Sequence, residues 1–257
     1  MAGGDGDQSY TKNSLYQRAI INAGKSLIQK SIYDHLGPKK FPASKTFRIA
    51  DLGCSVGPNT FISIDNILGV VKFKYLNINA NEIPEFQVFF NDHTFNDFNT
   101  LFKSLPPNRE YYASGVPGSF YTRLFPRASI HIVHSSYSLQ WLSQVPIEIT
   151  DPNSPAWNKG RIHYVGAGEE VINAYLRQHA DDFSKFLDAR AQEIVPGGLL
   201  LLILPLGLID EEKVDSFNMP CYMASPHEFE QVIKQNGRFK DRKDGGFTSG
   251  KSFPHSQ

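Results

Sequence analysis

Two glycines and two aspartates are spaced as a nucleoside-binding site would need them. The stretch "IADLGCSVGPNT", residues 49–60, reads as a short apolar strand that runs into a turn with Gly53 and Gly57. Glycine lets the backbone turn tightly and approach a ligand closely, and a helix that follows from Asn59 would present free N–H groups. Asp92 ends a second apolar stretch, "EFQVFFND", where an acid can accept hydrogen bonds from two ribose hydroxyls. An ordinary strand-to-helix turn explains the glycines alone, but not the acid beside them.

The spacing of the turn argues against a dinucleotide. The pattern is G-x-x-x-G and not G-x-G-x-x-G, and Pro58 removes one backbone donor at the helix start, where a pyrophosphate would need it. A nucleoside without phosphates fits better, and S-adenosylmethionine is such a ligand. Asp51, on the first strand, is placed to serve the cationic end of its amino-acid tail.

The elements that must position these residues alternate along the chain. Apolar residues at helical spacing predict helices over residues 14–36, 59–76, 96–105 and 169–195, the last ended by Pro196, Gly197 and Gly198, with Ser14 or Asn13 able to cap the first. Buried strands are expected over 47–53, 85–92 and 199–204, a strand turning into a helix over 128–142, and loop over 111–125. This alternation predicts an α/β fold with a parallel, doubly wound sheet, whose ligand sits beyond the carboxyl ends of the strands.

Composition excludes several classes of protein. The 26 basic and 26 acidic residues of the 257 cancel, so no basic field is available for a nucleic acid or an anionic membrane. Cys54 and Cys221 lie far apart in the sequence, which argues against a disulfide scaffold or a zinc site and favours a reducing compartment. The first residues resemble no signal peptide, and the longest apolar run, Leu199 to Leu204, is too short to span a bilayer. We therefore expect a cytoplasmic protein with no nucleic-acid or membrane partner.

Long strings in the chain carry a resemblance to a known family. They are "SYTKNSLYQ", "ADLGCSVGPNT", "FFNDHTFNDFNTLF", "GVPGSFYTRLFPRASIHIVHSSYSLQWLSQVP", "NKGRIHY", "VPGG" and "EEKVDSFNMP". In this order, from about Ser9 to Phe239, they resemble the plant SABATH family of S-adenosylmethionine-dependent methyltransferases, which methylate carboxyl groups of salicylate, benzoate, jasmonate and related acids. The resemblance implies a Rossmann-like class I methyltransferase fold with a partial helical cap, and a homodimer as one expected assembly.

The resemblance also implies a set of cofactor-binding residues. The positions that match the family pattern are Tyr10, Asn13, Ser14, Asp51, Cys54, Asn59, Asp92, Ser119, Phe120 and Ser135. His93 stands where the family has an apolar residue that packs on adenine. An imidazole can stack there, but it also brings a polar edge.

For the acceptor, the resemblance implies that Gln17 and Trp141 donate hydrogen bonds to a substrate carboxylate, with Tyr137 and Gln140 shaping the pocket. A carboxylic acid with a pKa of about 4 is ionised at neutral pH, so its carboxylate needs no general base to attack a sulfonium methyl group. Glutamine at position 140 also occurs in the family's xanthine N-methylating branch, which keeps a ring nitrogen open as the acceptor atom. Without the resemblance, Gln17 would be a surface residue and Trp141 a core residue.

The resemblance also implies a metal site in some members of the family. Some family members bind Mg²⁺ at positions that match Asn158, Asp215, Phe217 through its carbonyl, and Asn218. Oxygen ligands suit that ion. His131 and His134 are three residues apart on an expected strand and therefore face opposite sides, which favours a structural role for both.

The chain also departs from the family pattern. Relatives carry a helical cap segment after the strand at 199–204, and further strands after "NGRF", that we do not find here. We expect an N-terminal segment covering the active site at residues 1–48, a cofactor-binding domain at 49–205, a remnant of the cap and C-terminal region at 206–240 and a polar, disordered tail at 241–257. The alternative to an enzyme is a truncated family member that binds cofactor weakly or not at all and pairs with a full-length homologue through its exposed sheet edge.

Overall fold

The computed structural model describes residues 4, 6–7, 9–37, 41, 45–77, 83–204 and 220–240. The chain divides into two compact units. The first contains residues 1–139 and 185–204, and the second contains residues 140–184 and 205–257. This division crosses the expected cofactor-binding range 49–205, because residues 140–184 fall in the second unit; the expected domain ranges stay predictions.

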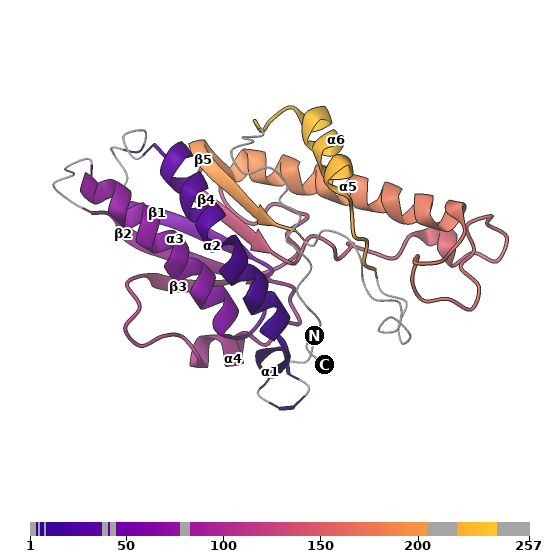
Figure 1. The fold of residues 1–257 in the computed structure, drawn as a ribbon, viewed down its shortest axis with the longest axis horizontal. Coiled ribbons are helices and arrows are strands. Elements are labelled where there is room, and N and C mark those ends of the chain that lie inside the picture. Colours follow the sequence, from indigo (N-terminus) through magenta and orange to yellow (C-terminus); the bar gives the residue numbers. More distant parts are fainter. Residues whose placement is uncertain are drawn as a thin grey trace. The chain divides into compact units, whose positions relative to one another are not determined.

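The first unit is built on a parallel sheet (Figure 1). Its strands are β1 (Thr46–Leu52), β2 (Glu85–Asp92), β3 (Tyr112–Pro117), β4 (Ile130–Ser136) and β5 (Ile194–Ile203). They lie in the order β3-β2-β1-β4-β5, and all four pairs are parallel. The winding reverses between β1 and β4, so the end of β1 lies at the position where such sheets bind ligands. The predicted doubly wound, Rossmann-like fold is confirmed.

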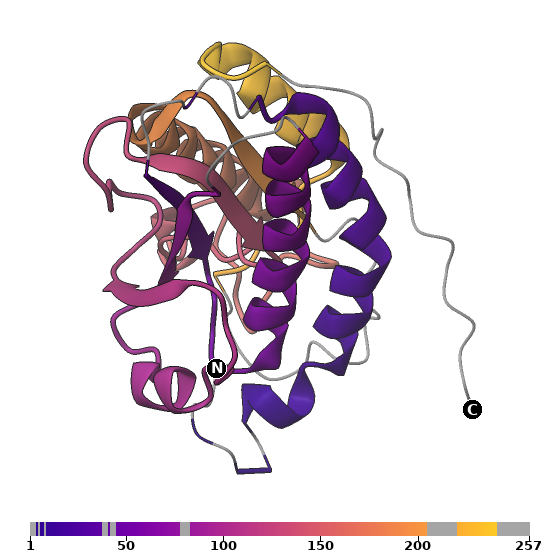
Figure 2. The ribbon, with the colours of Figure 1, turned by 90° about the vertical axis from the view of Figure 1, so that its left-hand side faces the viewer.

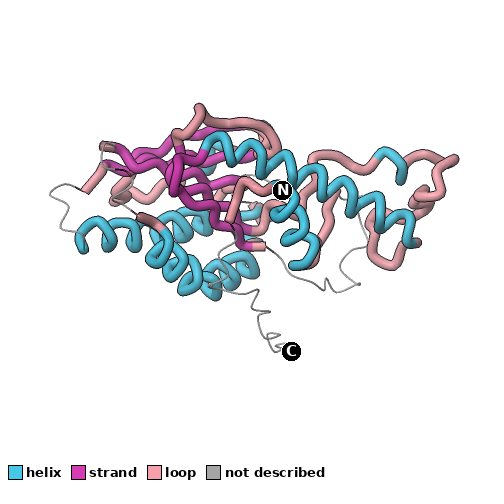
Figure 3. The backbone as a smooth tube through the Cα atoms, turned by 90° about the horizontal axis from the view of Figure 1, so that it is seen from above, coloured by secondary structure: helices cyan, strands magenta, loops and turns pink. Residues whose placement is uncertain are grey.

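Two long helices of the first unit pack together on one face of the sheet (Figures 2 and 3). They are α2 (Leu15–His35) and α3 (Pro58–Asn77), accompanied by the short helices α1 (Tyr10–Asn13) and α4 (Phe98–Lys103). Pro58 occupies the first helical position of α3, where its missing N–H costs nothing. The core beneath these helices includes Phe47, Ile49 and Ile64, which are fully buried.

The second unit carries η2 (Ile147–Ile149), residues 169–184 of α5 (Glu169–Glu193) and α6 (Pro226–Asn236). A capping box of Ser225 and Glu228 begins α6, and Gly237, in the left-handed conformation, ends it. Buried aromatic side chains, among them Phe183 and Phe229 with ring centroids 4.9 Å apart, form the core of this unit. Within the described ranges, no helix has the length and apolar character needed to cross a membrane.

The structure corrects three of the expected elements. Residues 112–117 are strand β3 and not loop, because pairing with β2 overrides the glycine and proline of "ASGVP". The strand β4 does not turn directly into a helix over residues 137–142: Tyr137 has a positive φ of 55°, and Trp141 forms an isolated antiparallel bridge with Cys221. Helix α5 ends at Glu193, and residues 196–198 lie inside β5, where they form an irregularity opposite Ile130 and Ile132.

Candidate functional site

The glycine turn joins the end of β1 to the start of α3. Gly53 has a φ of 78°, and the N–H groups of Gly53 and Cys54 both donate to the carbonyl of Asn91 at 2.9 and 3.0 Å. A Cβ atom on Gly53 would lie 2.1 Å from Oγ of Ser138 and 3.7 Å from the ring of Phe120. The position therefore needs glycine for both its conformation and its surroundings.

Asp92, at the end of β2, is held by two backbone donors. Its Oδ2 accepts from the N–H of Ser55 at 2.7 Å, and its Oδ1 accepts from the N–H of His93 at 2.7 Å. Burial raises the pKa of Asp92, and these two N–H groups partly oppose that rise. The carboxylate is thus fixed in orientation, and its remaining lone pairs are available to vicinal hydroxyls such as those of a ribose.

Asp51 is almost fully buried beneath the same turn. Its Oδ1 lies 2.7 Å from Nδ1 of His134, and its Oδ2 accepts from the hydroxyl of Thr60. Both carboxylate oxygens are therefore already engaged with protein side chains. Nearby, the hydroxyl of Ser135 donates to the carbonyl of Leu52 at 2.9 Å and closes this end of β4.

The N-terminal segment is tied to the turn through Asn59. The amide of Asn59 donates to the carbonyl of Ser14 at 3.1 Å and accepts from Nε of Arg18 at 3.1 Å. Tyr10 also hydrogen-bonds the Asn59 side chain, and burial raises the pKa of the Tyr10 hydroxyl. The exposed Asn13 instead donates locally, to the carbonyls of Asp7 and Ser9.

The loop after β3 brings two further predicted residues to this place. Ser119 is half-buried and its hydroxyl accepts from the N–H of Tyr121 at 3.3 Å. The ring of Phe120 faces Gly53, since a Cβ atom on that glycine would lie 3.7 Å from it. The exposed His93 stacks on Phe95, with ring centroids 5.4 Å apart, so one face of this imidazole is covered by that ring.

Cys54 is buried in the turn and its Sγ contacts the carbonyl of Ser55 at 3.5 Å. Burial raises the pKa of the thiol well above its ordinary value, and the neighbouring Asp92 and Asp51 raise it further. Cys54 is therefore a neutral thiol that packs, and it is not a thiolate nucleophile.

Two of the predicted acceptor residues lie in the first unit. Gln17, on α2, is half-buried, and its Oε1 has no hydrogen-bond partner among the residues that the structure describes. Tyr137 follows β4 and its hydroxyl donates to that of Tyr16 at 3.4 Å, with the two rings edge to face. Burial raises the pKa of Tyr137, so this hydroxyl stays protonated and can donate.

The other two predicted acceptor residues lie in the second unit. Gln140 has a buried side chain, and its carbonyl accepts from the N–H of Tyr222 at 2.8 Å. Trp141 is half-buried and is held by its bridge to Cys221. These backbone contacts join residues 140 and 141 to residues 221 and 222 within the second unit.

Of the predicted magnesium ligands, only Asn158 is described. It is buried and donates to the carbonyl of His163 at 3.1 Å. Asp215, Phe217 and Asn218 lie outside the described residues. Over the parts of the chain that the structure covers, no group of three or more His, Cys, Asp or Glu side chains is arranged to hold a metal ion. The magnesium site stays a prediction.

Sequence reasoning missed three residues that shape this site. Asn91 is fully buried, and its amide donates to the carbonyls of Val116 and Gly118, which ties the loop after β3 to the end of β2. Ser55 adopts a positive φ of 54° and orients Asp92. Ser138 fills the space beside Gly53. The only signal in the sequence was their adjacency to the predicted turn and strand ends.

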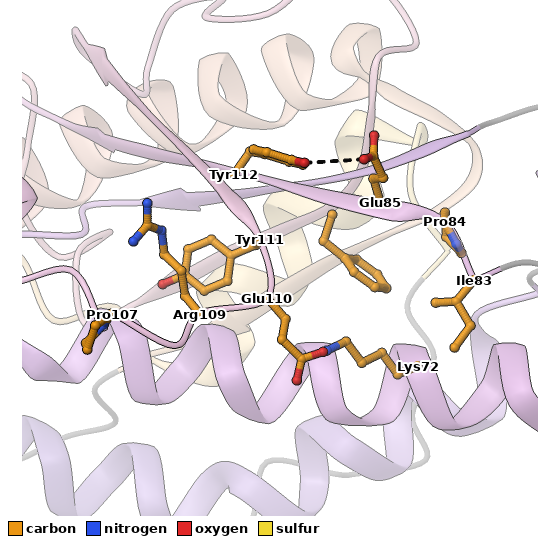
Figure 4. Close-up of a pocket in the computed structure, with 10 residues that line it drawn as sticks. Lys72, Ile83, Pro84, Glu85, Pro107, Arg109, Glu110, Tyr111 and Tyr112 are labelled. Atoms are coloured by element: carbon orange, nitrogen blue, oxygen red, sulfur yellow. Dashed lines mark hydrogen bonds and ion pairs between the residues drawn. The ribbon is translucent and has the colours of Figure 1, made fainter.

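A separate hollow of about 600 Å³ lies at the opposite ends of the strands (Figure 4). It is lined by residues from the starts of β2 and β3, such as Glu85 and Tyr112, and by Lys72 of α3. Lys72 pairs with Glu110 there, and the Tyr112 hydroxyl donates to Glu85. None of the predicted site residues lines it, so it is distinct from the glycine turn.

The residues around the turn fit S-adenosylmethionine. Gly53 and Gly57 let the backbone adopt the positive φ angles of the turn, Asp92 is oriented to accept from hydroxyls, and Phe120 offers a ring beside Gly53. Pro58 removes a backbone donor at the start of α3, and the N–H groups of Gly53 and Cys54 already donate to Asn91, so the turn suits a nucleoside without phosphates better than a pyrophosphate.

Comparisons with known proteins agree with this geometry. The sequence pattern of the family described as SAM dependent carboxyl methyltransferase matches residues 1–206 and 203–245, two segments that overlap at residues 203–206. Loganic acid O-methyltransferase of Catharanthus roseus is 48% identical over 272 aligned residues, which cover 93% of this chain and 73% of that protein. Farnesoic acid carboxyl-O-methyltransferase of Arabidopsis thaliana is 44% identical, with 93% and 76% covered.

A solved structure shows the same likeness in three dimensions. The structure of a loganic acid methyltransferase with S-adenosylhomocysteine superposes with a TM-score of 0.84 at 49% identity, covering 92% of this chain and 76% of that one. Since the family pattern covers most of the chain and the relatives exceed 40% identity over nine-tenths of it, the chain belongs to the S-adenosylmethionine-dependent carboxyl methyltransferases, the SABATH family that its sequence resembles.

Proposed function

We propose that this protein transfers a methyl group from S-adenosylmethionine to the carboxylate of a small plant acid and so forms a methyl ester. The observation that carries the proposal is its similarity, across nine-tenths of the chain, to proteins named for the carboxyl methylation of loganic and farnesoic acids. The orientation of Asp92 beside the glycine turn supports it, since a ribose needs such an acceptor.

The protonation states at the site suit an acceptor that needs no base. S-adenosylmethionine supplies an activated methyl group when it is bound. Burial raises the pKa of Tyr10 and of Tyr137, so both hydroxyls remain neutral donors. Neither can act as a general base at neutral pH, and a carboxylate, already ionised, requires none.

The chain's own contribution is then to position the acid. Gln17 carries an amide whose Oε1 has no partner within the described part of the chain, and an amide can turn to present its NH₂ group as a donor. The paired hydroxyls of Tyr137 and Tyr16 offer one further donor in the first unit, because only one of their two protons lies between them. Holding the reacting atoms in line can contribute up to roughly 7–11 kcal/mol in favourable cases. For Trp141 and Gln140 the predicted role in binding the acceptor stays a prediction.

The chemical identity of the acceptor is tested directly by a panel. Loganic, farnesoic, salicylic and benzoic acids are incubated with the protein and labelled S-adenosylmethionine, beside a xanthine, and the methylated product is identified. Ester formation on at least one acid supports the proposal. Methylation of the xanthine nitrogen alone would overturn it in favour of the branch that Gln140 suggests.

Cofactor binding is tested separately by calorimetric titration with S-adenosylhomocysteine. The chain is compared with Asp92→Ala and with Glu85→Ala, a matched loss of an acid at the other end of β2. One-to-one binding that only Asp92→Ala abolishes supports the site. No binding by folded chain would overturn the proposal and favour an inactive family member. Dimer formation, a cytoplasmic location and magnesium binding stay predictions.

A further inference from the structure

The last turn of α5 carries two charged side chains that are completely buried. Arg190 and Glu193 are both 0% exposed, and Nε of Arg190 lies 2.7 Å from Oε2 of Glu193. On the sequence they look like an ordinary surface pair on an amphipathic helix. Burying two ions is costly, and such a pair is weak evidence for stability by itself. The role of the pair therefore depends on the groups to which the two side chains hydrogen-bond.

Both side chains bind the backbone of one loop, residues 118–125. The guanidinium of Arg190 donates from Nη1 to the carbonyl of Phe120 at 2.7 Å and from Nη2 to that of Thr122 at 2.9 Å. Oε1 of Glu193 accepts from the N–H groups of Leu124 and Phe125 at 2.5 and 3.0 Å. Four backbone groups of the loop are thus held by two rigid, charge-assisted anchors.

The start of the same loop is joined to the end of β2. The N–H of Gly118 donates to the carbonyl of Asp92 at 2.9 Å, and its carbonyl accepts from the buried Asn91. Between these anchors lies Phe120, whose ring faces Gly53 and packs edge to face on Phe186 of α5, with centroids 6.2 Å apart. The loop is therefore fixed at both ends, with the residue that faces the glycine turn in the middle.

We propose that Arg190 and Glu193 are positioning residues for the cofactor: by clamping the backbone of residues 120–125 they place Ser119 and Phe120 against the adenine. The inference rests on the proposed cofactor site and adds residues that do not touch the ligand. It explains why the end of α5 buries two ions away from solvent, because a planar guanidinium can donate to two carbonyls at once. It predicts an effect on cofactor affinity that exceeds any effect on catalysis.

The test compares four variants by calorimetric titration with S-adenosylhomocysteine and by methyl-transfer kinetics. Arg190→Met removes the guanidinium that donates to the two loop carbonyls. Arg190→Lys keeps the positive charge but loses the paired donors, and Arg190→Met/Glu193→Leu removes both ions. Asp182→Asn is the matched control, because Asp182 is an equally buried acid on the same helix that binds Ser143 and not the loop. Thermal unfolding of each variant reports its stability.

We expect Arg190→Met to lower the affinity for S-adenosylhomocysteine on the order of tenfold or more, and Arg190→Lys to lower it less. The KM for S-adenosylmethionine should rise by a similar factor while kcat and the KM for the acid change little. The double variant should regain stability, since no buried ion is left unpaired, but not affinity. Asp182→Asn should lose stability and keep its affinity.

Two outcomes would overturn the inference. If the double variant regains both stability and affinity, the pair only supports the fold. If Arg190→Met binds as tightly as the unaltered chain, the loop does not depend on the clamp. Failure of the unaltered, folded chain to bind S-adenosylhomocysteine would instead refute the proposed function, which keeps the two failures apart.

Discussion

The carboxylate of Asp92 accepts the N–H of Ser55 at 2.7 Å, and this hydrogen bond joins the end of β2 to the turn after β1. Ser55 adopts a left-handed conformation to make it, with a φ of 54°. The second oxygen of Asp92 accepts from the N–H of His93 at the same distance. Both donors belong to the backbone, so the turn itself orients the acid that we assign to the ribose.

This relationship predicts how cofactor binding depends on pH. Burial raises the pKa of Asp92, so the acid becomes protonated at a higher pH than an exposed aspartate would. A protonated carboxyl is a poorer acceptor, and we expect the affinity for S-adenosylhomocysteine to fall by roughly tenfold as the pH drops through that pKa. Calorimetric titration between pH 7.5 and 4.5 measures this fall.

The sign of the stability effect separates binding from acid unfolding. Because the folded pKa of Asp92 is raised, its contribution to stability is present below the unfolded pKa and is lost as pH rises through the folded value. Acid therefore weakens binding while this group alone favours the ligand-free fold. Asp92→Asn should bind weakly at every pH with a flat profile, and a variant profile parallel to that of the unaltered chain would contradict the assignment.

A second prediction concerns the backbone of the turn. Gly53→Ala would place Cβ 2.1 Å from Oγ of Ser138 at a φ of 78°, so we expect a loss of about 2 kcal/mol in the free energy of unfolding and weaker S-adenosylhomocysteine binding. Gly69→Ala is the control, because Gly69 is exposed within α3 with nothing near its Cβ. That change should stabilise the chain by about 1 kcal/mol.

The double variant Gly53→Ala/Ser138→Gly tells the two causes apart. Removing the Ser138 side chain relieves the overlap but leaves the unfavourable φ, so only part of the stability should return. Urea unfolding measures all four chains. Full recovery of the free energy of unfolding would show that alanine pays no cost for the positive φ at position 53, contrary to the prediction.

A third prediction concerns the acceptor. Gln17→Leu removes the amide that we assign to the substrate carboxylate and keeps a side chain of similar size. Loss of a hydrogen bond to a charged group costs about 1.5–3 kcal/mol, so kcat/KM for the acid should fall by roughly 10 to 100-fold. The affinity for S-adenosylhomocysteine should not change. Steady-state kinetics with the acid found in the panel measures it.

Gln29→Leu, on the same helix α2, is the matched control and should retain full kcat/KM. An equal loss of S-adenosylhomocysteine affinity in Gln17→Leu would instead place Gln17 in the cofactor site. No loss of either would return Gln17 to the role of a surface residue.

The parts of the fold that are encoded locally could be predicted from the sequence. The helices α2, α3 and α5, the strands β1 and β2, and the turn at Gly53 each follow from periodicity or from glycine chemistry. Strand β3 could not, because "ASGVP" has a poor strand propensity and is ordered by its pairing with β2. The burial of Arg190 and Glu193 could not either, since nothing local distinguishes a buried ion pair from an exposed one.

The course of the chain after β4 was also beyond sequence reasoning. "SYSLQWL" has apolar residues at helical spacing, but Tyr137 takes a positive φ and Trp141 bridges to Cys221, about 80 residues later in the chain. Contacts at that separation leave no local pattern. The family resemblance named the residues of the site, whereas their hydrogen bonds, such as those that occupy both oxygens of Asp51, came only from the structure.

The last prediction concerns a buried histidine of the second unit. His179 is 1% exposed, its Nε2 has no partner in the described part of the chain, and its ring packs among those of Tyr222, Phe183 and Phe229. Burial lowers the pKa of His179 from 6.5 to about 4, although the nearby carboxylates of Glu228 and Asp182 act in the opposite direction. The folded chain therefore holds this imidazole neutral.

A depressed histidine pKa makes stability fall with acid. The unfolded chain takes up a proton below pH 6.5 and the folded chain only near pH 4, so stability is lost as the pH drops between these values. At 1.36 kcal/mol per pH unit the loss from this group is about 3 kcal/mol. His179→Phe should remove that share of the pH dependence measured by urea unfolding from pH 7.5 to 4.5.

Phe183→Leu is the control, because it disturbs the same cluster and keeps the imidazole. It should lower the free energy of unfolding by a similar amount at every pH and leave the slope in place. His131, in the first unit, also has a pKa lowered to about 4 by burial, so some acid sensitivity should survive in His179→Phe. If His179→Phe keeps the full slope of the unaltered chain, the imidazole takes up its proton at the same pH in the folded and unfolded chains, and burial does not lower its pKa.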